Sequence, residues 1–504
     1  MKNVKHTIIL SVLLLIGLVP ANAQYDETNN LFYHAQRAPQ SNLLNPAFFP
    51  NRNTFYLTLP TLDFSLGLPL ALNDLAYVDK ANQITVINID SIFNKLNDNN
   101  QFRFGFDLNV LGFGLKIKNL FIDANVRLVN RLSIGIPISV VNLLMEGNMI
   151  DMDTPNPEIN IVNGDLFNFN SYLETSIGGG YHISPINLTI GAHVKLLSGL
   201  ASIQTDKTSI TLETDNNLEY VRAHMYYQLQ AGAFFPYDTS FSFNDVIKTM
   251  RDDPRSILNS LFDNTGFAFD LGAKWEIGPL ALSVALRDIS PGIHWKKNVH
   301  TIHPETEGIL EYSGLDFNSM LNNGTFSTDS LTSSLQEFLD AMKNVVYENS
   351  GDYYAHIPAK IDIGASITLL QYLRAGLLFH GQLDRGFFPR SNATAGDAIG
   401  NNFTNTFRWN TTLSLSLNLF NWAEFILGSS IVYDGQNMDF FNPGAGIILS
   451  TGTALQTYFM ADYVSSIHLT QTKAFNIKAG TNILLGKGGK KKKSTPFLPD
   501  IPLL

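Results

Sequence analysis

Apolar and polar residues alternate with a period of two along many segments of this chain. The longest such segments cover residues 101–110, 186–196, 267–277 and 407–419. In the last of them, Leu413, Leu415 and Leu417 alternate with Ser414, Ser416 and Asn418. Because successive side chains of a strand point to opposite faces, each segment predicts a β-strand with one apolar and one polar face.

The length of these segments separates two kinds of β-protein. Strands of soluble sandwiches usually have about five or six residues, whereas a tilted membrane strand needs about nine to eleven. Gly, Ser, Thr and Asn dominate the polar faces, which suits a wet lumen. We therefore expect an all-β fold, a transmembrane antiparallel up-and-down β-barrel of about 14 strands (range 12–16). A secreted all-β sandwich or solenoid is the alternative.

The connections between the predicted strands alternate in length. Short turns are expected at 184–185, 278–279, 370–371, 420–421 and 450–451. Longer segments are expected at about 141–171, 234–265, 289–357, 385–404 and 434–442. Short periplasmic turns and long external loops are typical of outer-membrane barrels. The weakest strand patterns are those of 54–66 and 201–214.

Two of the long inserts have apolar residues at helical spacing. Residues 333–348 place Leu335, Phe338, Leu339, Met342 and Val346 on one face. Residues 243–262 predict two short amphipathic helices broken at Pro254. We expect short helices in the long loops that pack over the barrel mouth; a gate or a partner dock is the alternative.

The first 23 residues have the pattern of a secretory signal peptide. Lys2 and Lys5 precede the apolar run 8–19, and an A-x-A site ends at Ala23. That run is shorter than the ~18 residues that a spanning helix needs, and an uncleaved anchor is the alternative. The expected organisation is a signal peptide (1–23), an N-terminal plug or lead-in segment (24–53), the barrel (54–486) and a basic periplasmic tail (487–504). The expected location is the outer membrane of a Gram-negative bacterium.

Composition narrows the function classes. The net charge is −10, and removal of Lys2 and Lys5 with the signal peptide would make it −12. This acidity argues against nucleic acid as a partner, because phosphate binding needs clustered Lys and Arg. Only 15% of residues are charged, against about 25% in soluble domains. We expect outer-membrane lipid to cover the surface that lacks charge.

An apolar, proline-bounded motif directly precedes the first predicted strand. Pro46 and Pro50 fix their own φ angles and bias the preceding residues away from helix. We expect the motif Asn45, Pro46, Ala47, Phe48 and Phe49 to form a compact turn across the periplasmic mouth. Burial of one Phe side chain contributes about 1.5–3 kcal/mol, so an apolar ligand of similar area would displace the plug and open a gate. A simple lead-in to the first strand is the alternative.

Charged residues occupy inward positions of many predicted strands. They are Arg103, Asp107, Asp123, Arg127, Asp270, Lys274, Arg287, Lys360, Asp362, Arg374 and Arg408. The simpler interpretation is cross-strand pairing that holds the wall together. The functional interpretation is that they line a polar permeation path through the lumen.

Catalytic motifs are absent from the sequence. The Lys-rich stretch 486–495 lacks the order of a phosphate-binding loop, and no G-x-S-x-G or H-E-x-x-H occurs. Gly178–Gly180 lies within a strand pattern and is better explained by a kink than by phosphate binding. We therefore predict no enzyme, with no catalytic residue, cofactor or metal. The tail at 487–504 is expected to be solvated, or else to dock a periplasmic or cell-wall partner.

Several motifs resemble known outer-membrane barrels. The motifs that show the resemblance are QSNLLNPAFFP at 40–50, SVALRDISPGIHW at 283–295, HIPAKIDIGAS at 356–366 and NPGAGIILSTG at 442–452. The NPAF motif before the first strand resembles the FadL superfamily of fatty-acid channels and its PorV- and PorQ-like relatives. The chain is more similar to an uncharacterised domain-of-unknown-function family of exported barrels. It departs from the FadL pattern in lacking a separate N-terminal hatch of similar length.

The resemblance implies two functions. One is a channel for hydrophobic or amphipathic small molecules, with a hydrophobic small-molecule ligand that leaves through a lateral opening. The other is a non-transporting structural or secretion-associated barrel that binds an exported protein, as PorV-like members do.

Overall fold

The computed structural model describes most of the predicted barrel. The described residues are 28–49, 55–79, 84–87, 95–96, 99–137, 159–162, 167–214, 221–234, 248, 251–304, 308–312, 345–349, 351–388, 407–420, 422–433, 438–451, 455–463 and 473–486. The predicted signal peptide and the basic tail lie outside them.

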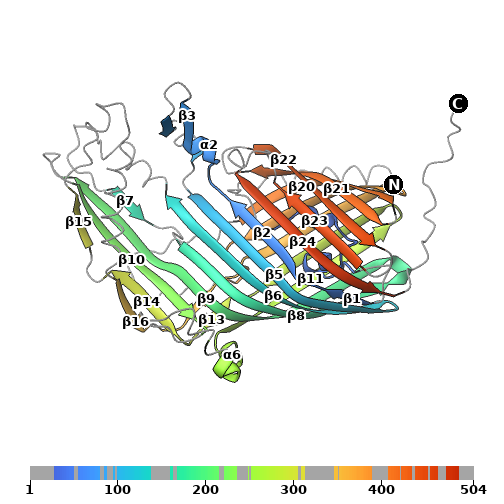
Figure 1. Cartoon of the computed structure of the whole chain (residues 1–504), viewed down its shortest axis with the longest axis horizontal. Helices are drawn as coiled ribbons and strands as arrows, with labels where there is room; N and C mark the ends of the chain where they lie inside the picture. Colours follow the sequence, from blue (N-terminus) through green and yellow to red (C-terminus); the bar gives the residue numbers. More distant parts are fainter. Residues whose placement is uncertain are drawn as a thin grey trace.

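Within these residues the chain forms a closed antiparallel barrel of fourteen wall strands (Figure 1). Nine wall strands are single segments: β5 (Asn99–Ile117), β6 (Leu120–Pro137), β9 (Leu188–Thr214), β19 (Leu373–Leu383), β20 (Phe407–Phe420), β21 (Ala423–Tyr433), β22 (Met438–Thr451), β23 (Leu455–Asp462) and β24 (Ala474–Leu485). A tenth, β8 (Phe167–Ile183), is continued along β9 by the short segment β7 (Ile159–Val162). The predicted fold class and strand number are confirmed.

The other four wall strands are each built from consecutive segments. They are β1 with β2 (Phe55–Thr58, Thr61–Gly67), β10 with β11 (Val221–Ala233, Thr265–Ile277), β12 to β15 (Leu280–Ile289, Ile293–Trp295, Val299–Pro304, Gly308–Tyr312) and β16 to β18 (Val345–Asn349, Tyr353–Ala355, Ala359–Leu370). The last strand β24 pairs with both β1 and β2, from Phe55 opposite Leu485 to Gly67 opposite Ala474, and so closes the ring.

The two ends of the barrel differ in the length of their connections. At one end, here the short-turn end, two to four residues join β5 to β6, β8 to β9, β11 to β12, β18 to β19, β20 to β21 and β22 to β23. Positive φ angles at Lys118, Asn187 and Gly278 let three of these turns be tight. The other end, the long-loop end, carries the longer connections, with α2 (Leu72–Leu75) and the hairpin β3–β4 (Ala76–Asp79, Ile84–Ile87). The predicted alternation of short and long connections agrees with this arrangement, but two predicted long loops are wrong. The segment 234–265 interrupts one wall strand, between β10 and β11, and 289–357 contains the wall segments β13 to β17.

One side of the wall continues beyond the long-loop end. The outer half of the long strand β9 pairs with β10, β10 pairs with β14 and β15, and β14 pairs with β16. This extension projects at the left of Figure 1. It explains why 201–214 is a strand despite its weak pattern.

The predicted helices are only partly correct. The helix α6 (Pro254–Ser260) begins at Pro254, as expected. It projects sideways from the outside of the wall and does not cover the mouth (Figure 1). The helix predicted at 333–348 is wrong at its end, because Val345–Asn349 forms β16 against β14. Its remaining residues lie outside the described part of the chain. Among the described residues, no helix is long and apolar enough to cross a membrane.

Side chains of the wall alternate between exposure and burial as the sequence predicts. Leu413 and Leu415 are 52% and 40% exposed, whereas Ser414 and Ser416 are buried. The same alternation places Phe267, Phe269 and Leu271 outside. The barrel therefore has an apolar exterior, and its core is the filled lumen.

The lumen near the long-loop end is filled by an apolar cluster around Trp295. Its indole is fully buried and lies parallel to the Tyr353 ring at 6.2 Å between centroids. Gly199 and Gly232 face the same indole so closely that an added Cβ would lie 2.7 and 2.5 Å from ring atoms. The two glycines make the space that the indole occupies.

We expect Trp295→Ala to lower the free energy of unfolding by about 3–5 kcal/mol, because the two glycines cannot fill the cavity. Urea titration followed by far-ultraviolet circular dichroism measures the loss. Trp295→Phe, which retains a ring, should lose clearly less. A loss below about 1 kcal/mol for the alanine variant would contradict the packing described.

Candidate functional site

The N-terminal segment 28–49 lies inside the barrel at its short-turn end. It contains two 3-10 helices, η1 (Leu31–His34) and η2 (Pro39–Leu43), and every residue of both is buried. Phe32 and Tyr33 pack with Leu378, Ile426 and other wall residues in one apolar cluster. The segment that fills the lumen is thus longer than the five-residue motif singled out in the sequence.

Polar contacts fix the first half of the segment to the last wall strands. The Asn30 amide donates to Asn410 Oδ1 (2.8 Å) and to the Tyr463 hydroxyl (2.6 Å). The Leu31 N–H donates to Asp462 Oδ2 at 3.1 Å. Arg37 donates to Asn418 Oδ1 at 2.9 Å and lies 3.7 Å from Glu424. Such bonds satisfy polar groups that burial would otherwise penalise.

The Asn45–Pro46 turn completes the segment. Asn45 Oδ1 accepts a hydrogen bond from the Ala47 N–H at 2.9 Å, which closes an Asx turn. The Asn45 amide nitrogen donates to the Tyr33 hydroxyl (3.1 Å) and to the wall carbonyl of Val284 (3.2 Å). Asn45 therefore joins both ends of the segment to the wall.

Three glycines in register form the inner wall behind this turn. Gly180 of β8 pairs with Gly191 of β9, and Gly191 pairs with Gly272 of β11. A Cβ on Gly191 would lie 2.2 Å from the Pro46 carbonyl oxygen, and one on Gly272 would lie 2.2 Å from Asn45 Oδ1. At both positions only glycine leaves room for the turn.

Three more glycines receive the rest of the segment. Added Cβ atoms would lie 2.6 Å from Tyr33 at Gly364, 2.5 Å from His34 at Gly376 and 2.6 Å from Leu31 at Gly428. We call these six residues the glycine collar: Gly180, Gly191, Gly272, Gly364, Gly376 and Gly428. The collar shapes the inner wall to this one segment in this one position.

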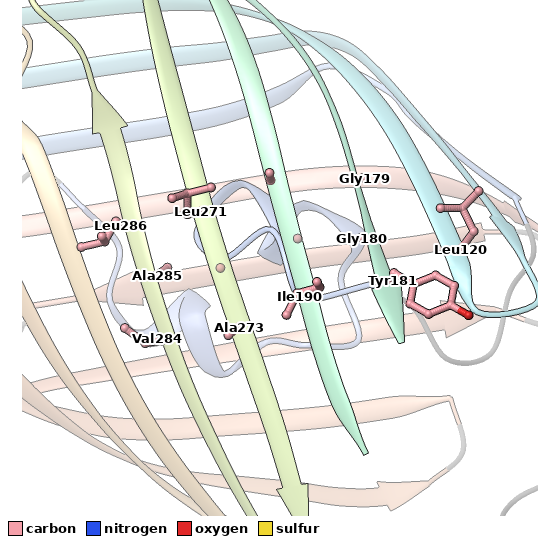
Figure 2. A pocket seen from close by; sticks show the side chains of 13 residues that line it. Leu120, Gly179, Gly180, Tyr181, Ile190, Leu271, Ala273, Val284, Ala285 and Leu286 are labelled. Carbon is pink, nitrogen blue, oxygen red and sulfur yellow. The ribbon is translucent and has the colours of Figure 1, made fainter. Parts of the chain in front are cut away.

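The outer face of the same wall region carries an apolar hollow of about 590 Å³ (Figure 2). The outward residues Gly179, Ala192 and Ala273 are small and form its floor. Ile190, Leu271, Tyr181 and other large residues form its rim. Figure 2 shows the N-terminal segment directly behind these strands. At the three paired glycines, only backbone separates the Asn45–Pro46 turn from the hollow.

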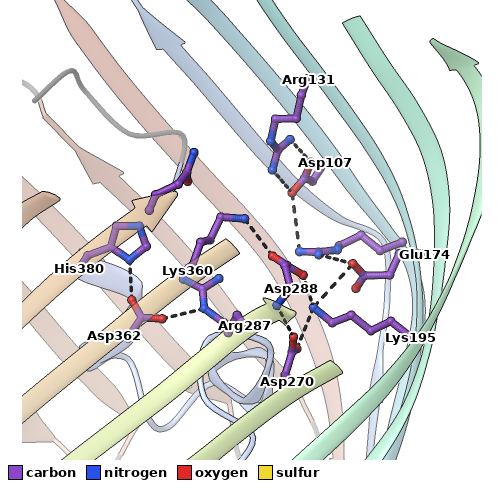
Figure 3. Close-up of polar contacts among 12 residues, drawn as sticks. Asp107, Arg131, Glu174, Lys195, Asp270, Arg287, Asp288, Lys360, Asp362 and His380 are labelled. Carbon is purple, nitrogen blue, oxygen red and sulfur yellow. Dashed lines mark hydrogen bonds and ion pairs between the residues drawn. The ribbon is translucent and has the colours of Figure 1, made fainter. Parts of the chain in front are cut away.

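A layer of ionisable side chains crosses the lumen next to the collar (Figure 3). This charge belt consists of Asp107, Arg127, Arg131, Glu174, Lys195, Asp270, Arg287, Asp288, Lys360, Asp362 and His380. On β9 and β11, Lys195 and Asp270 are inward positions closer to the long-loop end than the collar residues of the same strands. The belt therefore separates the N-terminal segment from the cluster around Trp295.

Partners within the belt lie at salt-bridge distance. Lys195 Nζ lies 2.7 Å from Asp270 and 2.6 Å from Asp288, and Lys360 lies 2.9 Å from Asp288. Arg287 lies 2.7 Å from Asp362, which also contacts His380 at 2.5 Å. In the other part of the belt, Arg127 lies 2.9 Å from Glu174, and Arg131 pairs with Asp107.

The predicted inward charges fall into groups. Asp107, Arg127, Asp270, Arg287, Lys360 and Asp362 belong to the belt, and Asp123 contacts His193 at 3.1 Å. Arg103 and Arg408 both approach Asp384, at 3.7 and 2.5 Å. Lys274 and Arg374 instead hold the N-terminal segment, through Gln36 Oε1 (3.0 Å) and the His34 carbonyl (2.5 Å). The contacts within the belt agree with cross-strand pairing, whereas Lys274 and Arg374 contact the N-terminal segment. Lining of a permeation path stays a prediction.

Several residues of the site were not singled out in the sequence. They are Arg131, Glu174, His193, Lys195, Asp288, His380 and Glu424. His193 and Lys195 lie on the polar face of the predicted strand 186–196. The alternation of apolar and polar residues alone could therefore have identified them as inward residues. Asp288 has a φ of 57° at a register shift between β11 and β12, which no alternation pattern reveals. Among the described residues, no group of three His, Cys, Asp or Glu could hold a metal ion.

Comparison with known proteins gives a family match over most of the chain. The model of a family of unknown function, DUF5723, matches residues 46–462. This agrees with the resemblance to uncharacterised barrels. No curated protein matches the chain.

Several solved bacterial proteins have structures similar to this chain at low sequence identity. The toluene transporter TodX of Pseudomonas putida is 8% identical, with a TM-score of 0.37 over 92% of this chain and 94% of that one. A Pseudomonas aeruginosa FadL homologue is also 8% identical, with a TM-score of 0.37 over 92% and 98%. The translocator domain of the Neisseria meningitidis autotransporter NalP is 7% identical, with a TM-score of 0.28 over 90% and 99%. TM-scores below 0.5 do not indicate what this chain does.

We expect Gly191→Ala to unseat the N-terminal segment, because the new Cβ would overlap the Pro46 carbonyl. Trypsin should then cut after Arg37, which the wall protects in the parent protein, and mass spectrometry identifies the fragment. Gly351→Ala is the matched control, since nothing lies within 4 Å of its added Cβ. Equal protection of Arg37 in both variants would contradict the fit.

The seating of the segment should weaken in acid through His34. Burial, and to a lesser extent the charge of Arg374, lowers the pKa of the His34 imidazole from 6.5 to about 3. In the unfolded chain the His34 imidazole is protonated below about pH 6.5, whereas in the folded protein it stays neutral down to about pH 3. The free energy of unfolding should therefore fall, as pH drops from 6.5 towards 3, by up to about 1.4 kcal/mol per pH unit.

Urea titrations of the parent protein and of His34→Gln between pH 7 and pH 4 measure this contribution. The variant should lose stability less steeply, because it has no imidazole to protonate. If the free energy of unfolding fell equally with pH in the parent protein and in His34→Gln, His34 would not contribute to the loss of stability in acid.

Proposed function

We propose that this chain, which belongs to the family of unknown function DUF5723, is an outer-membrane channel of a Gram-negative bacterium for hydrophobic or amphipathic small molecules. The described structure is its closed state, in which residues 28–49 act as the plug. The observation that carries the proposal is the apolar hollow on the outer wall, directly behind the seat of the plug.

The exterior of the barrel supports a membrane location. Ile177, Phe267, Leu271, Leu413 and Leu427 are more than half exposed, yet all are large and apolar. They lie on four strands of a closed wall (β8, β11, β20 and β21), where each backbone group can pair with the next strand. A closed barrel with an outward apolar band is one of the two structures that can span a bilayer. By the same pattern, the short-turn end faces the periplasm.

The N-terminal segment supports a path that does not run straight through the barrel. The segment is fixed at the short-turn end by the glycine collar and by polar bonds to the last strands. A molecule that enters from the long-loop end therefore meets a closed periplasmic end. The remaining exit from the lumen is sideways, through the wall.

The three paired glycines are the part of the wall best suited to open. Neighbouring strands are held together by backbone hydrogen bonds and by cross-strand pairs of side chains. Glycine has no side chain, so it contributes only the backbone bonds. The backbone ladder at Gly180, Gly191 and Gly272 is continuous in this state. Withdrawal of the Asn45–Pro46 turn would remove the contacts that brace it from inside.

The hollow outside these glycines fits an apolar ligand. Binding sites for small molecules usually have volumes of about 300–1,000 Å³ and apolar linings, and the hollow of about 590 Å³ has both features. It faces the same side as the lipid-exposed band. A hydrophobic molecule that leaves the lumen here would enter the bilayer without crossing water.

A non-transporting barrel that binds exported proteins is the second candidate. The charge belt favours it, because its ion pairs fill the lumen beside the plug and satisfy one another. Breaking one buried pair costs about 3–5 kcal/mol, so the belt resists rearrangement during transport. The sheet that extends beyond the long-loop end would then be the binding platform.

We expect the double variant Ala192→Phe, Ala273→Phe to lower the uptake of a hydrophobic fluorescent dye several-fold in proteoliposomes. The two rings would fill the floor of the hollow from the lipid side, without contact to the plug. Ala375→Phe is the matched control, because Ala375 is in β19 and does not line the hollow. Heat-modifiable gel mobility shows that each variant is folded.

Equal uptake by the double variant and by Ala375→Phe would exclude the hollow as the exit. Uptake by the parent protein no faster than that of empty liposomes would favour the non-transporting candidate.

A further inference from the structure

The segment between β10 and β11 leaves the wall and carries a helix on the outside of the barrel. This helix, α6, begins at Pro254, a favoured first residue of helices. The Ser256 N–H donates to Asp253 Oδ1 at 3.2 Å and thereby caps the first turn. In Figure 1 the helix stands clear of the wall, beside the barrel.

A buried asparagine fixes the position of this segment. Asn264 is fully buried, and its Oδ1 accepts bonds from the N–H groups of Lys296 (2.8 Å) and Lys297 (3.0 Å). Its amide nitrogen donates to the Lys297 carbonyl at 3.1 Å, and its own carbonyl accepts from the Gly199 N–H at 2.8 Å. The C-terminal end of the segment is therefore attached to the β9 and β13–β14 parts of the wall.

The segment exposes large apolar side chains at a defined height. Leu258 and Phe262 are 58% and 64% exposed. The outward apolar band of β11 begins only five residues after Phe262, at Phe267, and runs to Ile277. The ten residue-to-residue steps from Phe267 to Ile277 cover about 33 Å along the strand, which corresponds to a band about 25 Å tall at the tilt of membrane barrels. Phe262 therefore lies at the long-loop edge of the band.

Basic residues surround these apolar side chains. Lys248, Arg251 and Arg255 of the segment are exposed, as are Lys296 and Lys297 of the adjoining β13–β14 connection. Among the described residues of this surface the acidic ones are Asp252, Asp253 and Asp263, so its described part has five basic and three acidic residues. Arg251 pairs with Asp252 (3.2 Å) and Lys297 with Asp263 (2.7 Å), which leaves Lys248, Arg255 and Lys296 as the basic residues that outnumber Asp253. Apolar residues flanked by Lys and Arg are typical of helices that lie in a membrane interface.

We propose that residues 251–263 form an interfacial anchor, in which Leu258 and Phe262 insert at the boundary between acyl chains and headgroups of the outer leaflet. Its basic residues contact the anionic headgroups there. The occupant of this surface is lipid, because the surface continues the apolar band of the wall and has the opposite charge to anionic lipid. The inference rests on the membrane location of the proposed function but not on transport.

Single-cysteine variants test the anchor directly, since the chain has no cysteine. A nitroxide spin label is attached to Phe262→Cys in folded protein reconstituted into vesicles of phosphatidylcholine and phosphatidylglycerol. Its accessibility to oxygen, which partitions into lipid, is compared with that to a water-soluble nickel chelate. Leu258→Cys serves as the second reporter in case the first variant does not fold.

Two controls fix the scale. Leu271→Cys reports the middle of the outward band, and Glu348→Cys reports the extension beyond the long-loop end, where its side chain is 64% exposed. We expect the Phe262 label to fall between them, with an oxygen-to-nickel ratio well above that of Glu348. Replacing phosphatidylglycerol with phosphatidylcholine should shift the label towards water.

The outcomes separate the two proposals. A Phe262 label as accessible to nickel as Glu348, with Leu271 in lipid, would overturn the anchor and leave the membrane location intact. A Phe262 label as deep as Leu271 would also overturn the interfacial position. A Leu271 label in water would overturn the membrane location itself, and the anchor with it.

Discussion

The closed ladder of backbone hydrogen bonds is the constraint on which the rest of this structure depends. Once β24 pairs with β1 and β2, the described wall strands form a closed ring, and along this ring each strand has a neighbour on both sides. Closure also forces every second side chain inward, so a wall of fourteen strands encloses a space that its own side chains must share. The N-terminal segment, the charge belt and the cluster around Trp295 are three ways of filling that space.

The filling is organised in layers because each layer satisfies a different kind of group. Apolar side chains of residues 28–49 pack where the wall offers glycine, and Phe32 of the segment also contacts the wall residue Tyr458, at 5.1 Å between ring centroids. The ionisable side chains of the belt are held by each other, which is the usual condition for charge away from water. The two apolar layers on either side give the belt a fixed position along the barrel.

Much of the wall could be predicted from the sequence because a period of two is a local signal. Leu413 and Ser414 reveal their faces without knowledge of any other strand. The contents of the lumen could not be predicted in the same way. Asn30 contacts Asn410 and Tyr463, partners about four hundred residues away, and Gly191 and Gly272 have no side chain whose pattern could reveal a contact. Val346 fits a helical stripe and yet lies in β16, because pairing with β14 outweighs local spacing.

The position of residues 28–49 has a consequence for how the chain reaches its final state. The segment precedes the first wall strand, yet its partners Asp462 and Asn476 belong to the last two, at sequence separations of 431 and 447 residues. Loop closure over such distances costs chain entropy before any contact compensates for it, which slows folding. The first part of the chain to be synthesised is therefore among the last to find its partners. These contacts can form only once the last two strands have taken their places in the wall.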